Sequence, residues 1–558
     1  LKHRYVGLLS FALNYKLDGF NVTGYHIVNL FIHIISGLLV YLIALLSFRT
    51  PFLSGSMLKD TSGYIALFSA LLFVSHPVQT EAVTYIFQRF ASLTGLFYML
   101  SVALYLKWRV PDQRPEGMTG RLKPLLWYWG SVASAVLAMK TKQNAITLPV
   151  MIAVFEFSLF TGEIKARAVK LLPLFATCLI IPATYLMDMG YDVEHATTGA
   201  KVSRIDYLIN QFPAVVKYFR LLILPIGQNL DHDYQVYQSF FEPKILISFL
   251  LLAAILGFAG YLFQRSRTGE PGFRLAALGI VWFFVTISIE SSLIPNANFI
   301  CEYRIYLPSA GIFISAATLF VMAVTMPGRR PGVKAAAGFI SLAVVVSLSV
   351  ASYARNGVWR DEITLWEDVV SKSPLKARGY LKLGHAYDKQ GRSEKALQLY
   401  NRSLALDPGR DGVYYSLGHT YAAMGNYDKA LSNLTQAIAV NPNFAEAFMK
   451  RGITYFEIGQ HGQALADFER AISAKPYYSE AYSNRGAVYF AGHNYGKAIE
   501  DWNHALALNP GLEKTYYRLG IAYSASGDIQ KAIENFSQAC SRGDVNGCRS
   551  LQAIRIKK

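Results

Sequence analysis

The sequence predicts an all-α protein in which a polytopic bundle of membrane helices precedes a solenoid of short helical repeats. Long apolar runs follow one another between residues 26 and 354, and a strict 34-residue period occupies the rest of the chain. Of the 558 residues, 53% are hydrophobic and only 16% are charged, whereas soluble domains carry about 25% charged residues. This composition excludes a disordered chain and disfavours a wholly soluble one.

The first half of the chain contains ten apolar runs. Because the hydrocarbon core offers no water, each backbone polar group must be satisfied within its own segment, and we expect every run to be helical. Some runs are shorter than the roughly 20 residues that a span needs, so their helices are expected to extend into flanking residues. The runs are 26–48, 61–78, 83–106, 125–139, 145–160, 171–187, 245–264, 275–290, 306–326 and 335–354.

The loops between these runs alternate in charge, which predicts their sidedness. Loops rich in Lys and Arg stay in the cytoplasm, and these are 49–60, 107–123, 163–170, 265–274 and 329–334. The acidic loops, which we place outside, are 188–206, 229–244 and 290–304. The alternation holds if segment 207–224, which contains several polar residues, is an amphipathic helix on the outer face and does not cross.

This topology accounts for most of the net charge of +17, which results from 54 Lys and Arg against 37 Asp and Glu. No nucleic-acid partner is therefore expected. The topology places residues 1–25 and everything after Arg355 outside. A chain that begins outside requires an earlier span, so we expect a further helix before Leu1. The membrane domain is predicted to be 1–355.

Four residue types recur every 34 residues in the second half, which is the period of tetratricopeptide repeats. Each such repeat is a pair of antiparallel helices, with small residues where the helices touch and Pro after the second helix. We predict a helical connector at 356–376, five repeats at 377–542, and a capping helix and tail at 543–558. The recurring residues are Pro374, Pro408, Pro442, Pro476 and Pro510; Gly384, Gly418, Gly452, Gly486 and Gly520; Tyr387, Tyr421, Tyr455, Tyr489 and Tyr523; and Ala396, Ala430, Ala464, Ala498 and Ala532.

A solenoid of this kind presents a concave surface that suits an extended peptide. Any single tyrosine near the start of a first helix is explained by packing within its repeat, and it is only the tyrosines as a group that predict a peptide-binding groove. The tyrosines are Tyr414, Tyr415, Tyr477, Tyr478, Tyr516 and Tyr517.

The spacing of Cys540 and Cys548 fits a local disulfide in an oxidising compartment. It fits two free thiols equally well.

Polar residues at the membrane border are the candidates for chemistry, because charge at membrane depth is costly. One such segment contains His76, Glu81 and Arg89. A simple ion pair between Glu81 and Arg89 explains these two residues as well as a functional role does. Lys142 stands just before the apolar run at 145–160. It is either a phosphate contact or an interfacial anchor.

Two further polar groups lie in the acidic loops. Asp231 and Asp233 flank His232, and carboxylate oxygens suit Mg²⁺ or Mn²⁺, although a solvated loop or a helix cap fits equally well. Arg304, two residues after Glu302, has the fork geometry to bind a phosphate in bidentate fashion. The sequence has no Walker loop, dinucleotide fingerprint, nucleophile elbow or HExxH motif.

Taken together, these motifs resemble the transmembrane and tetratricopeptide-repeat O-mannosyltransferases, and the bacterial members more than the animal ones. The resemblance covers essentially the whole chain, and it is the combination of motifs that is specific. The stretches that carry it are Arg4 with 9–15, 24–33, 76–89, 147–149, 229–234, 302–308, and 359–366 ahead of the repeats.

The resemblance implies a membrane glycosyltransferase of the GT-C type, which takes a sugar such as mannose from a polyprenyl-phosphate carrier on the outer face. The acceptor it implies is a Ser or Thr hydroxyl of an exported protein, recruited by the repeats. The bacterial likeness favours the inner membrane with periplasmic repeats over the endoplasmic-reticulum membrane with lumenal repeats. Whether a divalent metal takes part is left open.

Within this resemblance, the border residues receive expected roles. Glycosyl transfer needs a base for the acceptor hydroxyl and fixed cations that stabilise the charge growing on the leaving phosphate. The candidate catalytic residues are Arg304 first, then Lys142 and Arg89, together with Glu81 and His76. The candidate substrate-binding residues are Arg4, Glu302, Asp231, His232, Asp233 and Tyr234.

The chain departs from the family pattern at three places. The catalytic acid that relatives place in their first outer loop is expected before Leu1. Gln143 stands where relatives have an acid, and Tyr5 where a Pro is common. Two other functions fit the same features: a non-catalytic membrane-anchored scaffold for exported proteins, and a lipid-linked-sugar transferase that acts on a glycan or a lipid.

Overall fold

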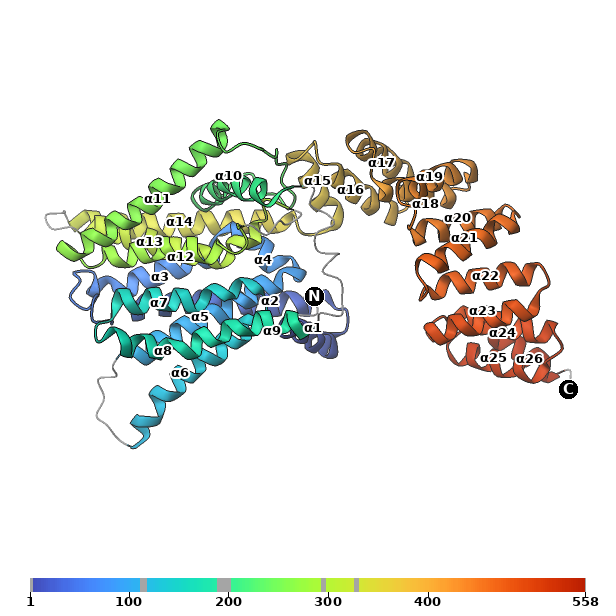
Figure 1. The fold of residues 1–558 in the computed structure, drawn as a ribbon, viewed down its shortest axis with the longest axis horizontal. Helices are drawn as coiled ribbons and strands as arrows, with labels where there is room; N and C mark the ends of the chain where they lie inside the picture. Colours follow the sequence, from blue (N-terminus) through green and yellow to red (C-terminus); the bar gives the residue numbers. More distant parts are fainter. Residues whose placement is uncertain (1–3, 111–117, 188–201, 293–297, 326–330, 557–558) are drawn as a thin grey trace. The chain divides into compact units, whose positions relative to one another are not determined.

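The computed structural model describes residues 4–110, 118–187, 202–292, 298–325 and 331–556. The chain divides into two compact units, Leu1–Lys372 and Ser373–Lys558. All regular elements within the described ranges are helices (Figure 1). The structure thus confirms the predicted all-α class, with apolar helices first and helical repeats after them.

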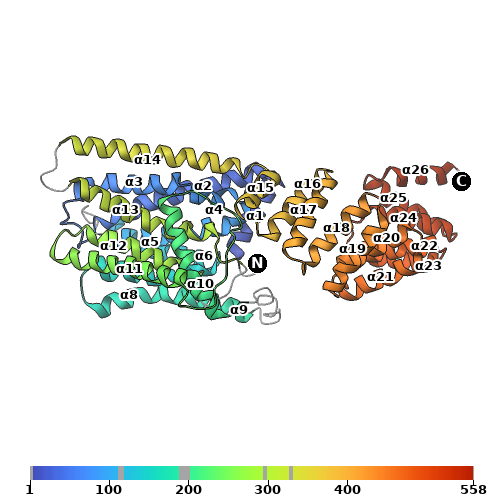
Figure 2. The same cartoon turned by 90° about the horizontal axis from the view of Figure 1, so that it is seen from above.

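The first unit is a bundle whose helices run roughly along one direction (Figures 1 and 2). Each of the ten predicted apolar runs coincides with one or more of these helices. The α-helices are α1 (Tyr5–Asp18), α2 (Val22–Ser47), α3 (Ser62–Ser75), α4 (Thr80–Thr84), α5 (Arg89–Arg109), α6 (Met118–Met139), α7 (Leu148–Leu159), α8 (Ile164–Ala176), α9 (Ile180–Met187), α10 (Arg204–Ile223), α11 (Pro243–Thr268), α12 (Phe273–Ile287), α13 (Tyr306–Thr325), α14 (Pro331–Gly357) and α15 (Glu362–Lys372). Short 3₁₀ turns are η1 (Lys59–Thr61), η2 (Pro77–Gln79), η3 (Ile86–Gln88), η4 (Gln143–Thr147), η5 (Thr177–Leu179) and η7 (Glu302–Ile305).

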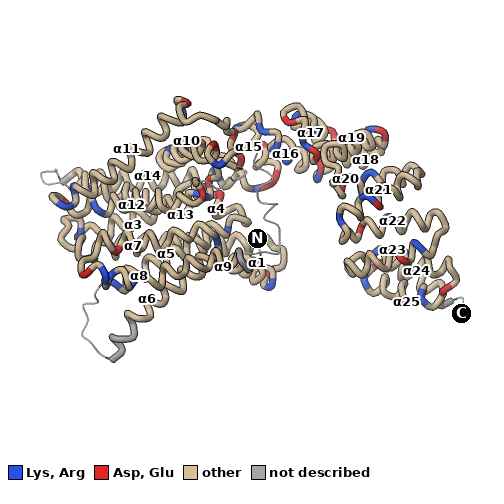
Figure 3. Tube along the Cα trace, in the orientation of Figure 1, with Lys and Arg blue, Asp and Glu red and all other residues tan. Residues whose placement is uncertain are grey.

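Several helices of this unit have the length and composition of membrane spans. Charged positions gather toward the ends of the bundle and are scarce along its middle (Figure 3). The prediction of about ten spans needs the shorter apolar helices α6, α7 and α12 to cross as well, together with the run 171–187 on α8 and α9, and it stays a prediction. Among the described residues, five helices are long and apolar enough to cross a membrane, or six if the bent pair Lys59–Ser75 and Pro77–Thr84 forms one span: Val22–Ser47, Ile86–Arg109, Pro243–Thr268, Glu302–Thr325 and Gly332–Gly357.

Small residues set the closest helix contacts of the bundle. A Cβ on Gly279 of α12 would lie 2.2 Å from the Gly311 carbonyl oxygen of α13, and a Cβ on Gly311 would lie 2.3 Å from the Gly279 oxygen. Between α5 and α6, the Ser101 and Ser131 hydroxyls each donate to the other residue's carbonyl at 2.8 Å. Small and hydroxyl residues at such crossings let backbones approach where no hydrophobic effect drives association.

The second unit stacks paired helices at the predicted 34-residue period. Its helices are α16 (Ala377–Lys389), α17 (Ser393–Leu406), α18 (Asp411–Ala423), α19 (Tyr427–Val440), α20 (Ala445–Glu457), α21 (His461–Ala474), α22 (Ser479–Ala491), α23 (Tyr495–Leu508), α24 (Glu513–Ala525), α25 (Ile529–Ser541) and α26 (Val545–Ile556). The recurring glycine of each first helix faces a large side chain of the second, for example Gly486 against Trp502, where an added Cβ would lie 2.8 Å from the indole nitrogen. The period is therefore a packing requirement.

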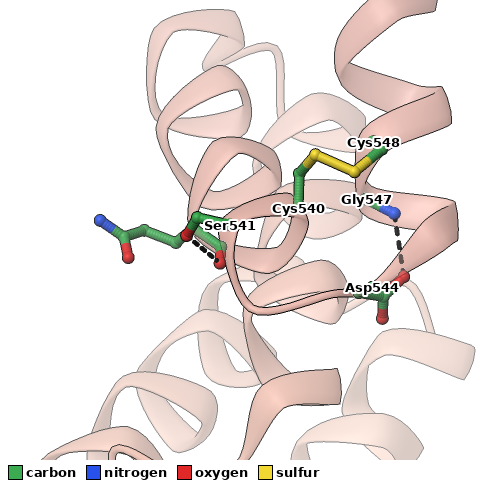
Figure 4. Close-up of a disulfide and its surroundings, with 6 residues drawn as sticks. Cys540, Ser541, Asp544, Gly547 and Cys548 are labelled. Carbon is green, nitrogen blue, oxygen red and sulfur yellow. Dashed lines mark hydrogen bonds between the residues drawn. A yellow bond between two sulfur atoms is a disulfide. The ribbon is translucent and has the colours of Figure 1, made fainter.

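The last helix, α26, is tied to the solenoid by a disulfide between Cys540 and Cys548 (Figure 4). The turn between them is fixed by Asp544, whose carboxylate accepts the Gly547 main-chain N–H at 2.9 Å. Of the two alternatives that the sequence allowed, the structure takes the bonded one. The remaining cysteines, Cys178 and Cys301, are free thiols.

The disulfide gives a direct biochemical prediction. We expect alkylation of the denatured, unreduced protein to modify two of its four cysteines, and all four after reduction. Replacing both Cys540 and Cys548 by serine is expected to lower the free energy of unfolding of the last repeat by about 2 kcal/mol, because a short loop is no longer closed in the unfolded chain. Mass spectrometry reports the alkylation, and four modified thiols before reduction would contradict the pairing.

Candidate functional site

The Glu302 carboxylate, at the start of η7, is the centre of a buried polar cluster. Its Oε1 accepts the main-chain N–H of Asn229 at 2.7 Å and lies 2.9 Å from His232 Nε2. Its Oε2 accepts the Gln228 side-chain amide at 3.0 Å. Glu302 is 2% exposed, so these donors replace the water that a buried carboxylate loses. The loop after α10 is thereby fastened to the start of α13.

His232 links Glu302 to a lysine of α10. Lys217 Nζ lies 2.9 Å from His232 Nδ1. Because a lysine ammonium only donates, Nδ1 accepts and Nε2 carries the proton that Glu302 accepts. Burial lowers the pKa of His232 against the opposing effect of Glu302, which favours the neutral ring in this arrangement. The result is a chain of hydrogen bonds from Lys217 through His232 to Glu302.

The rest of the 229–234 segment points in several directions. Asp231 is buried, Asp233 is exposed, and the two carboxylates therefore have different surroundings. Tyr234 donates its hydroxyl to the Asn210 carbonyl at 2.8 Å and stacks on Phe299 with ring centroids 4.9 Å apart. No group of three His, Cys, Asp or Glu side chains with metal-site geometry occurs among the described residues. Within the described residues, Asp231 and Asp233 therefore have no third carboxylate, histidine or cysteine with which to form a metal site.

Glu81 on α4 caps the segment that carries Glu302. Its Oε2 accepts the Tyr303 main-chain N–H at 3.1 Å, and Glu81 is buried. A side-chain oxygen at this place satisfies an N–H at a helix start. The alternative pairing of Glu81 with Arg89 is not formed, because Arg89 donates to Asn29, as described below.

Arg304 is turned inward and holds the chain just before η7. Its Nη1 donates to the Phe299 carbonyl at 3.1 Å and its Nη2 to the Asn298 carbonyl at 2.9 Å. The side chain is buried at 3% exposure. The fork that the sequence suggested for a phosphate is thus used on two main-chain oxygens, and Arg304 shapes the loop that leads to Glu302.

Lys142 lies next to the same segment from another direction. It forms an ion pair with Glu290, which follows α12, and its Nζ lies 4.9 Å from the centroid of the Tyr303 ring. Lys142 is 9% exposed. The structure therefore brings Lys142, Glu81 and Glu302 together around residues 302–304, although they are far apart in the sequence.

Two apolar cavities border the end of α12, beside Glu290. One, of about 470 Å³, is lined by Ile146, Thr147 and Val150 after Lys142 and by residues of 284–289. The other, of about 430 Å³, lies between α10, α11 and the same end of α12. Both polar atoms of Gln211, which lines the second cavity, lack a hydrogen-bond partner within the part of the chain that the structure describes. The Lys142–Glu290 ion pair, the two apolar cavities and the unsatisfied amide of Gln211 therefore all lie near the end of α12.

The remaining predicted residues lie elsewhere and make structural contacts. Arg89 donates from Nε to Asn29 at 2.6 Å, from Nη1 to the Ser10 carbonyl and from Nη2 to the Tyr25 carbonyl, which ties α1, α2 and α5 together. His76 Nε2 lies 3.1 Å from the Leu222 carbonyl, and its Nδ1 accepts the Val78 N–H. The Arg4 guanidinium lies 5.3 Å from the Phe90 ring centroid.

Sequence reasoning missed four members of the cluster as site residues. Gln228 was not among the predicted residues. Asn229 was expected only as the first residue of the 229–234 stretch, and Lys217 only as a polar residue of an amphipathic helix. Glu290 stood out only as an acid of an outer loop. A signal did exist for Lys217 and Glu290, because both are charged residues beside apolar helices and a buried charge needs a partner.

The fold and this site define a polytopic helical membrane protein with a buried polar cluster at one end of its bundle and a repeat solenoid after it. Family models confirm the repeats: those described as tetratricopeptide repeat match residues 415–479 and 477–542, and one described as TPR repeat matches 384–425.

The curated relatives of the chain are protein O-mannosyl-transferases of the TMTC type. It is 25% identical over 425 residues to Protein O-mannosyl-transferase F38B6.6 of Caenorhabditis elegans, covering 73% of this chain and 54% of that protein. It is 24% identical over 438 residues to Protein O-mannosyl-transferase TMTC4 of Mus musculus, covering 71% and 57%. Over 153 residues it is 31% identical to human Protein O-mannosyl-transferase TMTC2, covering 27% and 16%.

The chain spans about half the length of the curated relatives it matches. Two solved structures are each similar to part of the chain. A crystal structure of MamA is 28% identical over 28% of this chain and 93% of its own, with a TM-score of 0.27. The TPR protein TTC0263 of Thermus thermophilus is 23% identical over 32% of this chain and 99% of its own, with a TM-score of 0.28.

Proposed function

We propose that the protein is a membrane glycosyltransferase that moves a sugar, mannose by analogy with its relatives, from a polyprenyl-phosphate carrier to Ser or Thr hydroxyls of exported proteins. The observation that carries the proposal is the extent of the similarity to protein O-mannosyl-transferases. The similarity to one relative covers 73% of this chain, whereas the repeat unit makes up only a third of the chain. The similarity therefore extends well into the membrane unit, where the polar cluster lies.

The cavities at the end of α12 support a lipid-linked donor. An isoprenoid chain needs apolar space between helices, and the phosphate needs a cation where that space ends. Ile146 and Thr147 line one cavity a single turn after Lys142, and its other wall ends one residue before Glu290, the ion-pair partner of Lys142. We assign Lys142 as the phosphate contact, with Glu290 holding the ammonium in place until donor binds.

The chemical step needs charge stabilisation at the leaving phosphate. As the bond between the sugar and the phosphate breaks, negative charge grows on the phosphate oxygens, and a fixed cation in a site of low dielectric lowers this barrier. Arg304 is proposed as a positioning residue that holds the loop before Glu302. Glu302, polarised by His232 and Lys217, is proposed to accept hydrogen bonds from the sugar or the acceptor. Glu81, Arg89, His76 and Arg4 keep supporting roles in this proposal.

The acceptor and the side of the membrane complete the proposal. The repeats recruit exported proteins and lie on the outer side, in the periplasm of a bacterial inner membrane. A disulfide between Cys540 and Cys548 is in keeping with an oxidising compartment. The assay below, run with and without EDTA, tests whether a divalent metal takes part.

The test is sugar transfer by the purified full-length protein in detergent, with mannosyl-phosphopolyprenol as donor and a Ser/Thr-rich peptide as acceptor, with and without EDTA. We expect a mannosylated peptide and release of polyprenyl phosphate. A folded protein that binds the peptide but transfers no sugar from any polyprenyl-phosphate donor would identify a scaffold. Transfer to a glycan or lipid acceptor but not to peptides would establish the other class of transferase.

A further inference from the structure

The cavity of about 430 Å³ between α10, α11 and the end of α12 is apolar over most of its wall. Phe212 and Val215 of α10 line it together with Leu252 and Leu256 of α11. None of the described residues that line it carries a charge. It therefore differs from the cavity beside Lys142, where a cation is at hand for the phosphate of the proposed donor.

Two polar side chains that line this cavity have no hydrogen-bond partner among the described residues. Gln211 is 2% exposed, and its amide nitrogen and oxygen are both unpaired, as is the buried hydroxyl of Ser291. The amide of the neighbouring Asn210, by contrast, donates to the Asp206 and Tyr237 carbonyls and accepts the Tyr237 main-chain N–H. An unpaired amide in apolar surroundings destabilises a fold. Gln211 therefore points to a ligand that both donates and accepts hydrogen bonds.

The unpaired amide lies at one end of the cavity, the end next to Glu290. The Tyr207 hydroxyl, near the start of α10, lies 3.5 Å from the Glu290 main-chain carbonyl oxygen. Further along α10, the Phe219 ring packs on Phe283 with ring centroids 4.3 Å apart. This helix therefore runs from Glu290 back along α12, and Gln211, one turn after Tyr207, is close to the Glu290 end.

The opposite end of the cavity is apolar. The Phe249 ring of α11 packs against Phe212, the residue after Gln211, with ring centroids 5.3 Å apart. Because the short segment 269–272 joins the end of α11 to the start of α12, these two helices run antiparallel, and Leu256 lies two turns further from the polar end than Phe249 does. The cavity thus has one polar and one apolar end, which matches a single-chain amphiphile.

The polar end selects the head group of such a ligand. A phosphate or a carboxylate would be buried there without a cation among the described lining residues, which is costly. An ester carbonyl only accepts, so it would leave the Gln211 oxygen unpaired. A hydroxyl is the smallest neutral group that does both, because it donates to this oxygen and accepts from the amide nitrogen or from the Ser291 hydroxyl.

We propose that this cavity binds a long-chain lipid alcohol, with its hydroxyl on the Gln211 amide and its chain along α11. The site is separate from the contact proposed for the charged donor, because Lys142 is not among the described residues that line it. Ser291, at the polar end, directly follows Glu290, the ion-pair partner of Lys142, so a bound alcohol also fixes the segment that holds this pair. The inference goes beyond the proposed function and does not depend on sugar transfer.

The experiment is photo-crosslinking of the full chain in phosphatidylcholine nanodiscs. The probe is a hexadecanol analogue with a diazirine at the far end of its chain, and mass spectrometry locates the attached probe. We expect attachment within residues 249–256, which contain the α11 residues that line the cavity. A matching hexadecane probe lacks the hydroxyl, and we expect about tenfold less attachment of it, because the hydrogen bonds to the amide are missing.

Competition with unlabelled lipids tests the head group. Unlabelled hexadecanol, a diacylglycerol and a polyprenol each support the inference if they displace the probe, and their order shows which alcohol fits. Hexadecyl phosphate is expected not to compete. Equal attachment of the alcohol and hydrocarbon probes, or competition by hexadecyl phosphate as strong as that by hexadecanol, overturns the inference.

Gln211→Leu removes the amide and keeps the volume of the side chain. We expect attachment of the alcohol probe to fall about tenfold, while the thermal unfolding temperature without added alcohol stays the same or rises because an unpaired buried amide is gone. Gln264→Leu, on an exposed position of α11 outside the cavity, is the matched control and is expected to change neither. Unchanged attachment of the alcohol probe to Gln211→Leu contradicts the inference.

Ala253→Phe is a second, independent variant, because it fills the apolar part of the cavity and leaves the amide in place. It is expected to block attachment of the alcohol probe. Ala254→Phe, at the next and exposed position outside the cavity lining, is its matched control and is expected to label like the wild-type protein. Equal labelling of Ala253→Phe and Ala254→Phe would place the probe outside the cavity and overturn the inference.

Discussion

Replacement of Lys142 by alanine is expected to lower the rate of sugar transfer by about 10²–10³-fold, the usual cost of removing one preorganised group that stabilises developing charge. Lys142 is the buried cation beside the apolar cavities at the end of α12. Its loss leaves the leaving phosphate without a counter-charge and Glu290 without its partner. The measurement is kcat and KM for mannosyl-phosphopolyprenol with the purified protein.

Lys140→Ala is the matched control for this change. Lys140 has the same charge two residues earlier, and its Nζ lies 5.4 Å from the centroid of the Tyr5 ring, so its loss is expected to change kcat less than threefold. The exchange Lys142→Glu with Glu290→Lys separates two explanations. If the ion pair matters only for stability, the exchange restores activity. If Lys142 contacts phosphate, activity stays low. Wild-type kcat in Lys142→Ala would refute the assignment.

Arg304→Ala is expected to abolish sugar transfer while expression and membrane insertion stay normal. Its guanidinium donates to the Phe299 and Asn298 carbonyls, and a buried acceptor left unpaired costs about 1–3 kcal/mol. The loop before Glu302 is then free to move, and the groups around the carboxylate lose their alignment. Transfer at the wild-type rate would contradict this prediction.

Arg304→Lys distinguishes positioning from phosphate binding. Lysine keeps the charge but lacks the planar fork that reaches two carbonyls at once. If Arg304 positions the loop, the lysine variant is expected to be nearly as inactive as Arg304→Ala, mainly through kcat. If Arg304 instead binds the phosphate, lysine is expected to retain part of the activity with a raised KM for the donor.

The repeat half was predictable because its period is a packing rule. Gly486 recurs every 34 residues since a side chain there would clash with Trp502, and such a requirement is visible in the sequence alone. The helices of the membrane half were equally visible as apolar runs. How many of them cross is harder to read, because α7 and α12 are apolar but shorter than a bilayer.

The candidate site was predictable in its residues but not in its contacts. Glu302, His232 and Lys142 stand out as polar residues at membrane borders. Their partners lie far away in the sequence: His232 is 70 residues from Glu302, and Lys142 is 148 residues from Glu290. Arg304 is the clearest example. An arginine at a membrane border predicts an anionic ligand, but in the folded protein its guanidinium donates to two main-chain carbonyls. Tertiary packing decides such choices, and no local pattern encodes it.

The proposed function requires the polar cluster and the repeats to lie on the non-cytoplasmic side of the membrane. Single cysteines at Asn443, on the repeats, and at Thr268, in a basic loop, test it in a background with Cys178 and Cys301 replaced by serine. A membrane-impermeant maleimide added to intact cells without an outer membrane is expected to label Asn443→Cys at once and Thr268→Cys only after permeabilisation. Labelling of Thr268→Cys in intact cells, with Asn443→Cys protected, would contradict it.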